Sequence, residues 1–354
     1  MNLPSSYNLS TNKLAASFAN ASATYKFYWL NAIIELVEND QTIIKKRDVF
    51  SRMISNSWYT INYFKVSFGK QDLIQNTVQN ILSFENLTKE VKKEILISKL
   101  ENSKNVETIK SLKHFDINVP HRFLSAWFPK LRNENDLSYK KRIYLSSQNF
   151  ENNCIYGLYN ECIIINPIWI NYLKSNAKVL KDYCYWNLAL FLQTRNPNVP
   201  DIPNKLIKPA IRKGLTSQTN KYWKNVFDKL GYINCIFTDT KLYFDEKNYA
   251  LDHFVPHAFV SHDLIWNLLP IEKKFNSSKS ADLPLMDKHF DAFYDIQKEA
   301  FGINMALNPN SKYMEEFLNV FKDYNKLNRK NYRELIQPLI TIANNNGFFY
   351  MKNE

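Results

Sequence analysis

Apolar residues recur every three or four positions through most of the first 130 residues, which is the spacing of amphipathic helices. The pattern predicts helices over 24–39, 49–64, 72–82 and 87–102. In the last of these segments, Asn86 or Thr88 is the expected N-cap. The apolar stripe of that helix is expected to comprise Val91, Ile95, Leu96 and Leu100. This part of the chain is therefore predicted to be mostly helical.

The helical spacing gives way to a different pattern in residues 142–166. Residues 155–165 are apolar and β-branched on both sides of a short polar segment, which predicts two short strands around a turn. Pro167 then opens a helical stretch that is expected to run to about Thr194.

Three prolines within seven residues, in the segment 196–203, give the strongest linker signal in the chain. We place a domain boundary there. The prediction is a mostly helical recognition or interaction domain over 1–198 and a second domain over 199–354, whose core spans about 230–285. The best helical patterns near the C-terminus lie at 314–327 and 332–345. The predicted fold class is α+β, mostly helical.

The core of the second domain combines strand and helix patterns. The expected elements are a strand over 249–254, a loop over 256–263, an apolar strand over 264–270 and a helix over 271–283. In the second strand, Trp266 and Leu268 are expected to face one side and Asn267 the other. The helix carries Asn276 and Lys279 one turn apart, so the end of the first strand and one helix face can converge.

The composition adds a charge argument. Lys and Arg number 46 against 34 Asp and Glu, which gives a net charge of +12. A basic surplus favours polyanionic partners, nucleic acid above all. A genome rich in A and T, which favours Lys, Asn and Ile codons, explains the same surplus equally well. Only 6 glycines are present, and no two stand close enough to cradle a phosphate, which excludes a P-loop and a Rossmann fingerprint.

The segment 205–229 concentrates positive charge, with seven basic residues against Asp228 alone. Aromatic residues lie among them, as a surface that follows phosphates requires. The segment is predicted to bind substrate through Arg212, Lys221 and Lys224. The alternative is a solvated helix face whose aromatic residues belong to the core.

Four cysteines without a CxxC pair argue against a disulfide scaffold, so a reduced compartment is expected. No structural zinc is expected for the same reason. The first residues lack the basic flank and apolar run of a signal peptide, and the apolar stretch at 183–192 is too short to span a membrane. We therefore expect a soluble, cytoplasmic protein without a membrane partner.

Three of the six histidines, His253, His257 and His262, fall within ten residues. Asp252 and Asn276 offer hard oxygen ligands, which suit Mg²⁺ or Mn²⁺ rather than zinc. A neutral imidazole at His253, beside a metal-bound phosphate, would be placed to remove a proton from water. Base, metal and phosphate together indicate hydrolysis of a phosphodiester.

These residues resemble the HNH (ββα-metal) endonuclease superfamily over about 50 residues, 230–283. Asp252-His253 matches the family's Asp-His pair, and Asn267 and Asn276 follow Asp252 by 15 and 24 residues. The same intervals occur in the HNH domain of RNA-guided CRISPR effector nucleases. The surrounding sequence resembles stand-alone bacterial HNH proteins of the restriction or phage-defence kind. The chain departs from many members in lacking CxxC zinc pairs, since only Cys235 lies near the expected place.

The resemblance implies a role for each matched residue. His253 would be the general base, and Asp252 and Asn276 would bind the metal. Asn267 would brace the loop that holds His253, and Lys279 would contact phosphate. His257 and His262 are candidate substrate contacts, with the alternative that they are polar loop residues.

The resulting function hypothesis is a metal-dependent DNA endonuclease in bacterial defence against foreign DNA. One alternative is an RNase or toxin that cuts host nucleic acid, since HNH chemistry takes place on the phosphate. Another is a non-catalytic nucleic-acid-binding subunit of a defence complex. A homodimer or a partner subunit fits double-strand cleavage by a protein with one site per chain. The N-terminal domain could read DNA, sense a trigger or dock a partner, and a contact patch there would comprise Arg122, Lys130 and Arg132 around Trp127 and Phe128.

Overall fold

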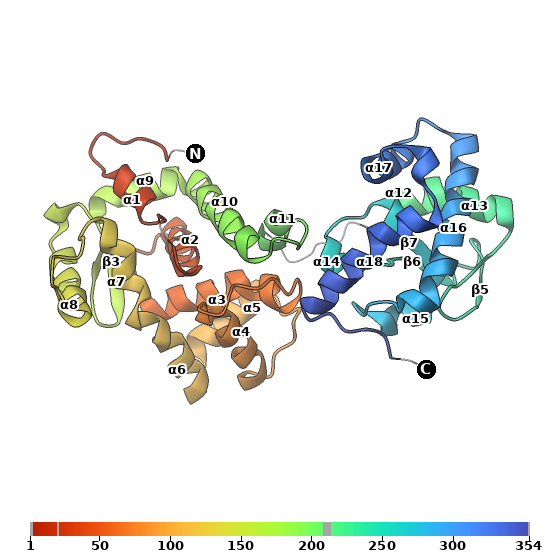
Figure 1. Ribbon diagram of the computed structural model, residues 1–354. Helices are drawn as coiled ribbons and strands as arrows, with labels where there is room; N and C mark the ends of the chain where they lie inside the picture. Colours follow the sequence, from red (N-terminus) through yellow and green to blue (C-terminus); the bar gives the residue numbers. More distant parts are fainter. Residues whose placement is uncertain (1–2, 20, 208–213, 353–354) are drawn as a thin grey trace. The chain divides into compact units, whose positions relative to one another are not determined.

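The computed structural model describes residues 3–19, 21–207 and 214–352 (Figure 1). The chain divides into two compact units. The N-terminal unit comprises Met1–Pro197 and Ile202–Pro209, and the C-terminal unit comprises Asn198–Asp201 and Ala210–Glu354. Within the described part of the chain, no helix combines the length and the apolar composition needed to cross a membrane.

The N-terminal unit is a helical assembly with one small sheet. Its helices are α1 (Thr11–Ala16), α2 (Tyr25–Glu38), α3 (Lys46–Asn62), α4 (Leu73–Phe84), α5 (Lys93–Asn102), α6 (Val106–His114), α7 (Val119–Phe123), α8 (Asp136–Ser147), α9 (Pro167–Ser175), α10 (Ala177–Arg195) and α11 (Ile202–Ile207). Short 3₁₀ turns are η1 (Phe115–Ile117), η2 (Leu124–Ala126) and η3 (Phe150–Asn152). The strands β1 (Ile43–Lys45), β2 (Tyr156–Leu158) and β3 (Cys162–Ile165) form an antiparallel sheet in the order β1-β3-β2.

Helix α2 is the centre of this unit. It is apolar on almost every side and packs against α3, α9 and α10 (Figure 1). A helix that is hydrophobic all round must be covered on all faces, which explains why the other helices surround it. The buried indoles of Trp29, Trp58 and Trp169 fill the core around it.

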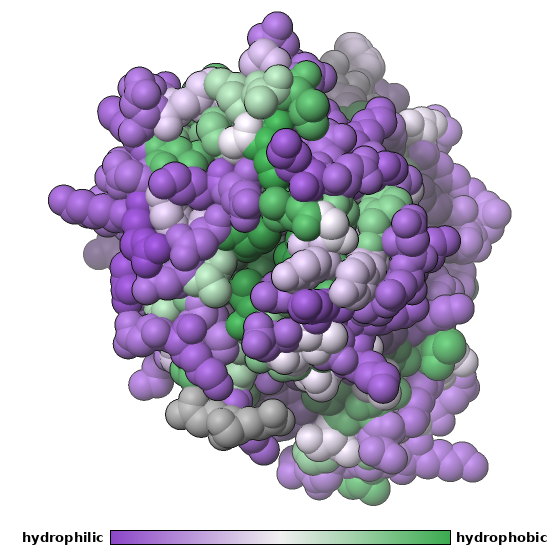
Figure 2. All heavy atoms as spheres, turned by 90° about the vertical axis from the view of Figure 1, so that its right-hand side faces the viewer, coloured by the Kyte–Doolittle hydropathy of each residue, from purple (hydrophilic) through white to green (hydrophobic). Residues whose placement is uncertain are grey.

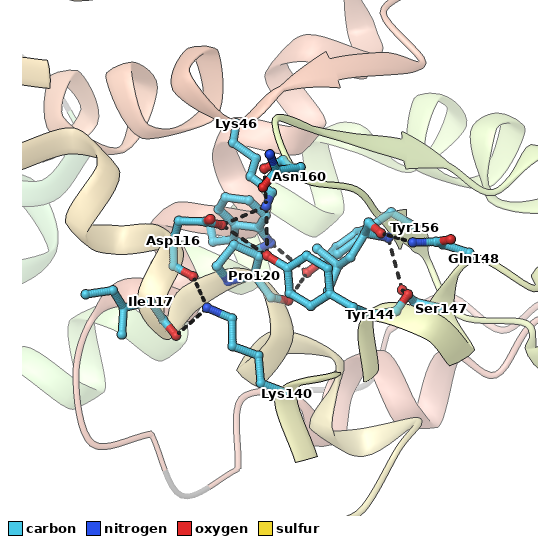
Figure 3. A network of polar contacts seen from close by, with 12 residues as sticks. Lys46, Asp116, Ile117, Pro120, Lys140, Tyr144, Ser147, Gln148, Tyr156 and Asn160 are labelled. Carbon is cyan, nitrogen blue, oxygen red and sulfur yellow. Dashed lines mark hydrogen bonds and ion pairs between the residues drawn. The ribbon is translucent and has the colours of Figure 1, made fainter. Parts of the chain in front are cut away.

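A partly buried polar network around Lys46 joins the sheet to the helices (Figure 3). The Lys46 ammonium lies 2.8 Å from a carboxylate oxygen of Asp116, 2.8 Å from the Tyr144 hydroxyl and 2.9 Å from the Asn160 carbonyl. Burial lowers the pKa of Lys46, and the Asp116 carboxylate opposes that shift. Because the charge is paired and hydrogen-bonded, its burial is tolerated.

Most of the predicted elements of this unit are confirmed. The exception is α5, which begins at Lys93 rather than at residue 87. The carbonyls of the preceding residues accept hydrogen bonds from Trp58 Nε1 and from the Tyr59 hydroxyl of α3, so a tertiary contact replaces the first predicted turn. The predicted stripe is also wrong at Ile95, whose surface is 56% exposed, whereas Leu96 is buried.

The C-terminal unit combines two short antiparallel ribbons with helices. Before the second ribbon lie α12 (Thr216–Gln218), the π-helical turn η4 (Thr219–Trp223), α13 (Lys224–Leu230), β4 (Ile233–Asn234) and β5 (Lys241–Leu242). Then follow β6 (Tyr249–His253), α14 (His257–Val260), η5 (Ile265–Asn267), β7 (Leu268–Glu272), α15 (Lys273–Lys279), α16 (Met286–Leu307), α17 (Lys312–Phe321), η6 (Tyr324–Lys326) and α18 (Arg329–Asn345). β4 pairs with β5 and β6 with β7. The predicted α+β, mostly helical class is confirmed.

Helices α16 and α18 cover the β6–β7 ribbon with aromatic side chains. The ring of Phe254 stacks on that of Phe293 with centroids 3.9 Å apart, and Tyr332 packs edge-on against Phe293. The apolar side of the ribbon therefore belongs to a core that the C-terminal helices complete. The outer face of this unit seen in Figure 2 is mostly hydrophilic, and a band of hydrophobic residues crosses it.

The predicted strand over 264–270 is wrong in its first half. Residues 265–267 form the 3₁₀ turn η5, so Trp266 and Asn267 do not alternate as strand residues do, and both are buried. The backbone here bonds to the C-terminal helices instead of to a strand, because the Ile265 N–H donates to Glu316 and the Trp266 carbonyl accepts from Tyr332.

Two neighbouring elements also differ from the expectation. The loop predicted over 256–263 contains the short helix α14. The helix predicted over 271–283 spans only Lys273–Lys279, because β7 continues to Glu272 and Ser280 adopts a φ of 49°.

Candidate active site

The second ribbon and α15 bring the chemical residues of the C-terminal unit to one place. Asp252 and His253 end β6, opposite Leu269 and Leu268 of β7. Helix α15 follows β7 directly and packs against both strands (Figure 1). The local structure is therefore a ββα unit with a carboxylate and an imidazole at the end of its first strand.

Asp252 is held by a buried ion pair with Lys279. The Lys279 ammonium lies 2.8 Å from Asp252 Oδ2 and 3.0 Å from the His253 carbonyl oxygen. Asp252 is 5% exposed and Lys279 3%. Burial raises the pKa of Asp252, but the ammonium and hydrogen bonds outweigh it and hold that pKa well below its usual range. The carboxylate is therefore ionised at neutral pH.

The His253 imidazole is fully buried between two groups of acceptors. Its Nε2 lies 3.1 Å from the His262 carbonyl oxygen and 3.0 Å from Asp263 Oδ1. Its Nδ1 lies on the other side, 3.9 Å from Asp252 Oδ1. Because both groups near Nε2 accept hydrogen bonds, the hydrogen-bond network assigns the proton of the neutral ring to Nε2. The basic lone pair is then on Nδ1.

Asn267 clamps the chain that follows His253. Its Oδ1 accepts from the Val255 N–H and its Nδ2 donates to the Val255 carbonyl, both at 2.8 Å. The Phe254 N–H donates to the Asn267 carbonyl, also at 2.8 Å. The end of β6 and the turn before β7 are therefore fixed to each other by buried hydrogen bonds.

Asn276 lies on α15, one turn before Lys279, and is half-buried. With Asp252 it supplies a carboxylate and an amide oxygen, a hard-oxygen set of the kind that binds Mg²⁺ together with water and substrate phosphates. Among the described residues there is no group of three or more His, Cys, Asp or Glu side chains that could hold a metal ion. A divalent cation held by Asp252 and Asn276 would take most of its ligands from water or phosphate.

The comparisons with known proteins agree with this geometry. Residues 235–285 match the sequence family described as HNH endonuclease. This part of the chain is an HNH domain. Neither the comparison with curated proteins nor that with solved structures finds a match. The resemblance to the HNH superfamily is thus confirmed, and it supports a nuclease of the HNH type.

The HNH match contains every residue of the ββα site. It ends before α16, although α16, α17 and α18 donate and accept the hydrogen bonds that shape η5. Gln297 of α16 donates to the Leu268 carbonyl at 2.6 Å, at the start of β7. The HNH domain of this chain therefore depends on helices outside the matched residues.

The other two histidines of the HNH domain, His257 and His262, lie close to His253. The ring centroid of His257 is 5.2 Å from that of His253, and its Nε2 is 4.0 Å from Asp263 Oδ1. His262 packs against Trp266, and burial lowers its pKa to about 4. His262 is therefore neutral at pH 7, and its carbonyl rather than its ring contacts His253. The role of both histidines as substrate contacts stays a prediction.

Asp263 is a site residue that the sequence analysis did not single out. Its carboxylate meets His253 Nε2 although it lies ten residues away in the chain. The available signal was an acidic residue directly after the third histidine of the cluster. Periodicity could not place it, because the loop between them folds back through α14.

The basic segment 205–229 does not form one continuous helix. Lys205 is buried in α11, and Arg212 lies outside the described residues. Lys221 is exposed, and Lys224 pairs with Asp228 at 2.5 Å on the surface of α13. The interleaved aromatics belong to the core, as the alternative interpretation held: Tyr222, Trp223 and Phe227. Phosphate binding by Lys221 and Lys224 stays a prediction.

Proposed function

We propose that this protein is a metal-dependent endonuclease that hydrolyses phosphodiester bonds of DNA. The observation that carries the proposal is the placement of His253, Asp252 and Asn276 on the strand end and helix of an HNH domain. The net charge of +12 supports a polyanionic substrate. His253 is the general base in this proposal, and Asp252 and Asn276 hold Mg²⁺ or Mn²⁺.

The hydrogen bonds around His253 suit a base. Nδ1 would take the proton of the attacking water, and Nε2 stays bonded to Asp263 and to the His262 carbonyl. The Asp263 carboxylate stabilises the imidazolium that forms and keeps the ring from turning. When bound, a divalent cation supplies stabilisation of the charge that develops on the phosphate oxygens.

Access to the base requires a local movement. His253 is fully buried, and Lys279 and Asp252 beside it are almost so. Water and phosphate therefore reach Nδ1 only when a neighbouring side chain or loop shifts. We infer that Lys279 keeps Asp252 ionised and in place at the site. Its role as a phosphate contact requires its ammonium to leave Asp252 Oδ2.

Cleavage of supercoiled plasmid by the full chain tests the activity. We expect nicked or linear DNA with Mg²⁺ or Mn²⁺ and none with EDTA. The product distinguishes cleavage of one strand from cleavage of two. Matched single-stranded RNA in a parallel reaction tests the alternative substrate. Cleavage of RNA alone, or cleavage that persists in EDTA, would contradict the proposal.

The proposal includes a role in defence against foreign DNA, which rests on the resemblance to stand-alone bacterial HNH proteins. Phage protection of cells that express the wild-type chain or the His253→Ala variant tests it. We expect protection by the wild type only. Equal protection by the variant would favour a non-catalytic subunit of a defence complex.

A further inference from the structure

A pocket of about 360 Å³ opens in the N-terminal unit, far in sequence from the HNH domain. It lies where α2 begins, beside α7 and the segment that leads into α8. Tyr25 and Tyr139 contribute aromatic surface to it. Its polar lining includes Lys26, Arg122 and Lys130.

The cations in this pocket outnumber the acids. Asp136 is the carboxylate in its lining, and it lies 2.6 Å from Lys130 and 3.8 Å from Arg122. Arg122 also donates to Asn118 Oδ1 at 3.1 Å. Lys26 makes no ion pair or hydrogen bond with any residue that the structure describes. The lining therefore carries two positive charges in excess.

The positive charges of Lys26 and Arg122 lie close enough to affect each other. Burial lowers the pKa of Lys26, and the Arg122 guanidinium lowers it further. Both effects disfavour the charged ammonium, and a bound anion would relieve both. The Lys26 ammonium and the Arg122 guanidinium repel each other, and both would attract a negatively charged ligand.

His121 gives an independent sign that a ligand belongs here. The residue lines the pocket and is only 4% exposed. Its Nδ1 is buried and has no hydrogen-bond partner among the described residues. Its ring packs edge-on against Tyr139 with centroids 6.4 Å apart, so it cannot turn away easily. A buried polar atom without a partner is costly, so a ligand that reaches Nδ1 would remove that cost.

The start of α2 already carries a carboxylate of the chain. This 14-residue helix has no acidic residue in its first turn, and its N-cap Thr24 makes no capping hydrogen bond with its side chain. The buried Asp72 carboxylate compensates the positive end of the helix dipole, because its Oδ2 accepts from the Thr24 N–H and from the Thr24 hydroxyl, both at 2.6 Å. The attraction for an anion therefore comes from the excess cations and His121, which favour a group with several anionic oxygens.

We propose that this pocket binds a small ligand that carries a phosphate group and is about the size of a nucleoside monophosphate. A volume of 360 Å³ lies at the lower end of the range for small-molecule sites, roughly 300–1,000 Å³. Guanidinium and ammonium groups recognise phosphate through charge-assisted hydrogen bonds. The tyrosines would contact the rest of the ligand. This site is independent of the proposed nuclease activity.

The pocket also revises the patch predicted around Arg122. Trp127 and Phe128, which the sequence placed beside it, are buried in the core. Arg122 and Lys130 belong to the pocket instead, whereas Arg132 does not line it. Arg122 and Lys130 therefore line a concave site and do not belong to an aromatic surface for nucleic acid.

Isothermal titration calorimetry on the full chain tests the proposal, with AMP, inorganic phosphate and adenosine as probes. We expect AMP to bind more tightly than phosphate and adenosine not to bind. Lys26→Met and Arg122→Gln should each weaken AMP binding by about tenfold or more, since each loses a charge-assisted contact. Lys178→Ala, an exposed lysine on α10, is the control and should leave binding unchanged.

A second readout reports on the pocket without a substitution in it. The imidazole signals of His121 in NMR spectra should shift on addition of AMP, and those of the exposed His114 should not. No binding of AMP or phosphate at millimolar concentration would overturn the proposal. So would AMP binding that survives both pocket variants with melting temperatures equal to that of the wild type. Loss of oligonucleotide binding in these variants, without any AMP binding in the wild type, would assign the pocket to nucleic acid and also overturn it.

Discussion

The residues of the candidate active site are held by partners that lie far from them in the chain. Asp252 is paired with Lys279 of α15, and His253 is bonded to Asp263 beyond α14. Each partner fixes a property that the chemistry needs. Lys279 keeps the carboxylate ionised, and Asp263 determines which nitrogen of the imidazole is basic.

Loss of Lys279 is expected to destabilise the fold strongly. Lys279→Met leaves Asp252 charged and buried without its cation, which typically costs about 3–5 kcal/mol. The double variant Asp252→Asn/Lys279→Met should recover most of that loss. Urea unfolding of the wild type, Lys279→Met, Asp252→Asn and the double variant measures it. Full additivity of the two single substitutions would show that the ion pair does not act as a pair.

The same pair predicts a pH dependence. The pKa of Asp252 is depressed in the folded chain, so the stability that the pair contributes is present above the unfolded value, about pH 4. It is lost as the pH falls toward the lower pKa of the folded state. The Asp252→Asn variant should lack this part of the acid-induced loss, and urea unfolding from pH 6 down to pH 3 measures it.

Asp263 is expected to act on the rate of cleavage rather than on substrate binding. In Asp263→Asn, the partner of His253 Nε2 loses its charge, so the imidazolium is less stabilised. We expect kcat to fall on the order of 10²-fold with KM little changed. Asp263→Glu should restore part of the rate. A rise in KM with kcat intact would instead make Asp263 a substrate contact.

At the scale of elements, the spacing of apolar residues predicted several of the helices and strands. It located α2, α3 and α4, the β2–β3 hairpin and the strand β6. It failed where a tertiary hydrogen bond replaces a local one, at the start of α5 and at η5. The chemical types and spacing of Asp252, His253, Asn267 and Asn276 were enough to identify the HNH domain. They could not reveal Asp263 or the ion pair with Lys279, since both depend on how loops and helices fold back.

The C-terminal helices are expected to stabilise the HNH domain through single hydrogen bonds. Tyr332→Phe removes the hydroxyl of α18 that donates to the buried Trp266 carbonyl in η5. The expected loss is about 1–2 kcal/mol of unfolding free energy. Tyr324→Phe is the control, because the Tyr324 hydroxyl makes no hydrogen bond with the residues the structure describes. Equal stability of both variants would show that α18 does not hold η5.

At the scale of the whole molecule, the two candidate sites lie in different units. The C-terminal unit carries the HNH domain, and the N-terminal unit carries a pocket suited to an anion. The basic residues that give the chain its net positive charge therefore do not form a single surface. Part of it is buried, as at Lys46 and Lys205, and part lines the pocket.

Lys221 and Lys224 of the C-terminal unit are expected to contribute to DNA binding through phosphates. Lys221→Ala/Lys224→Ala should weaken binding and reduce the slope of log K against log salt by about 0.9 for each lost phosphate contact on duplex DNA. Fluorescence anisotropy at several salt concentrations measures the slope. The pair Lys326→Ala/Lys330→Ala, also exposed in this unit, is the control. An unchanged slope in the first variant would place the DNA elsewhere.

The most direct test of the central claim is the cleavage rate of His253→Ala, measured with Mg²⁺ at saturating DNA beside its DNA affinity. The account predicts a loss of at least about 10²-fold in rate, with DNA affinity unchanged, in a variant that remains folded at the assay temperature. His114→Ala, an exposed histidine of the N-terminal unit, should cleave as the wild type does. Equal losses of rate and affinity, or a rate that survives the substitution, would contradict the assignment of His253 as the base.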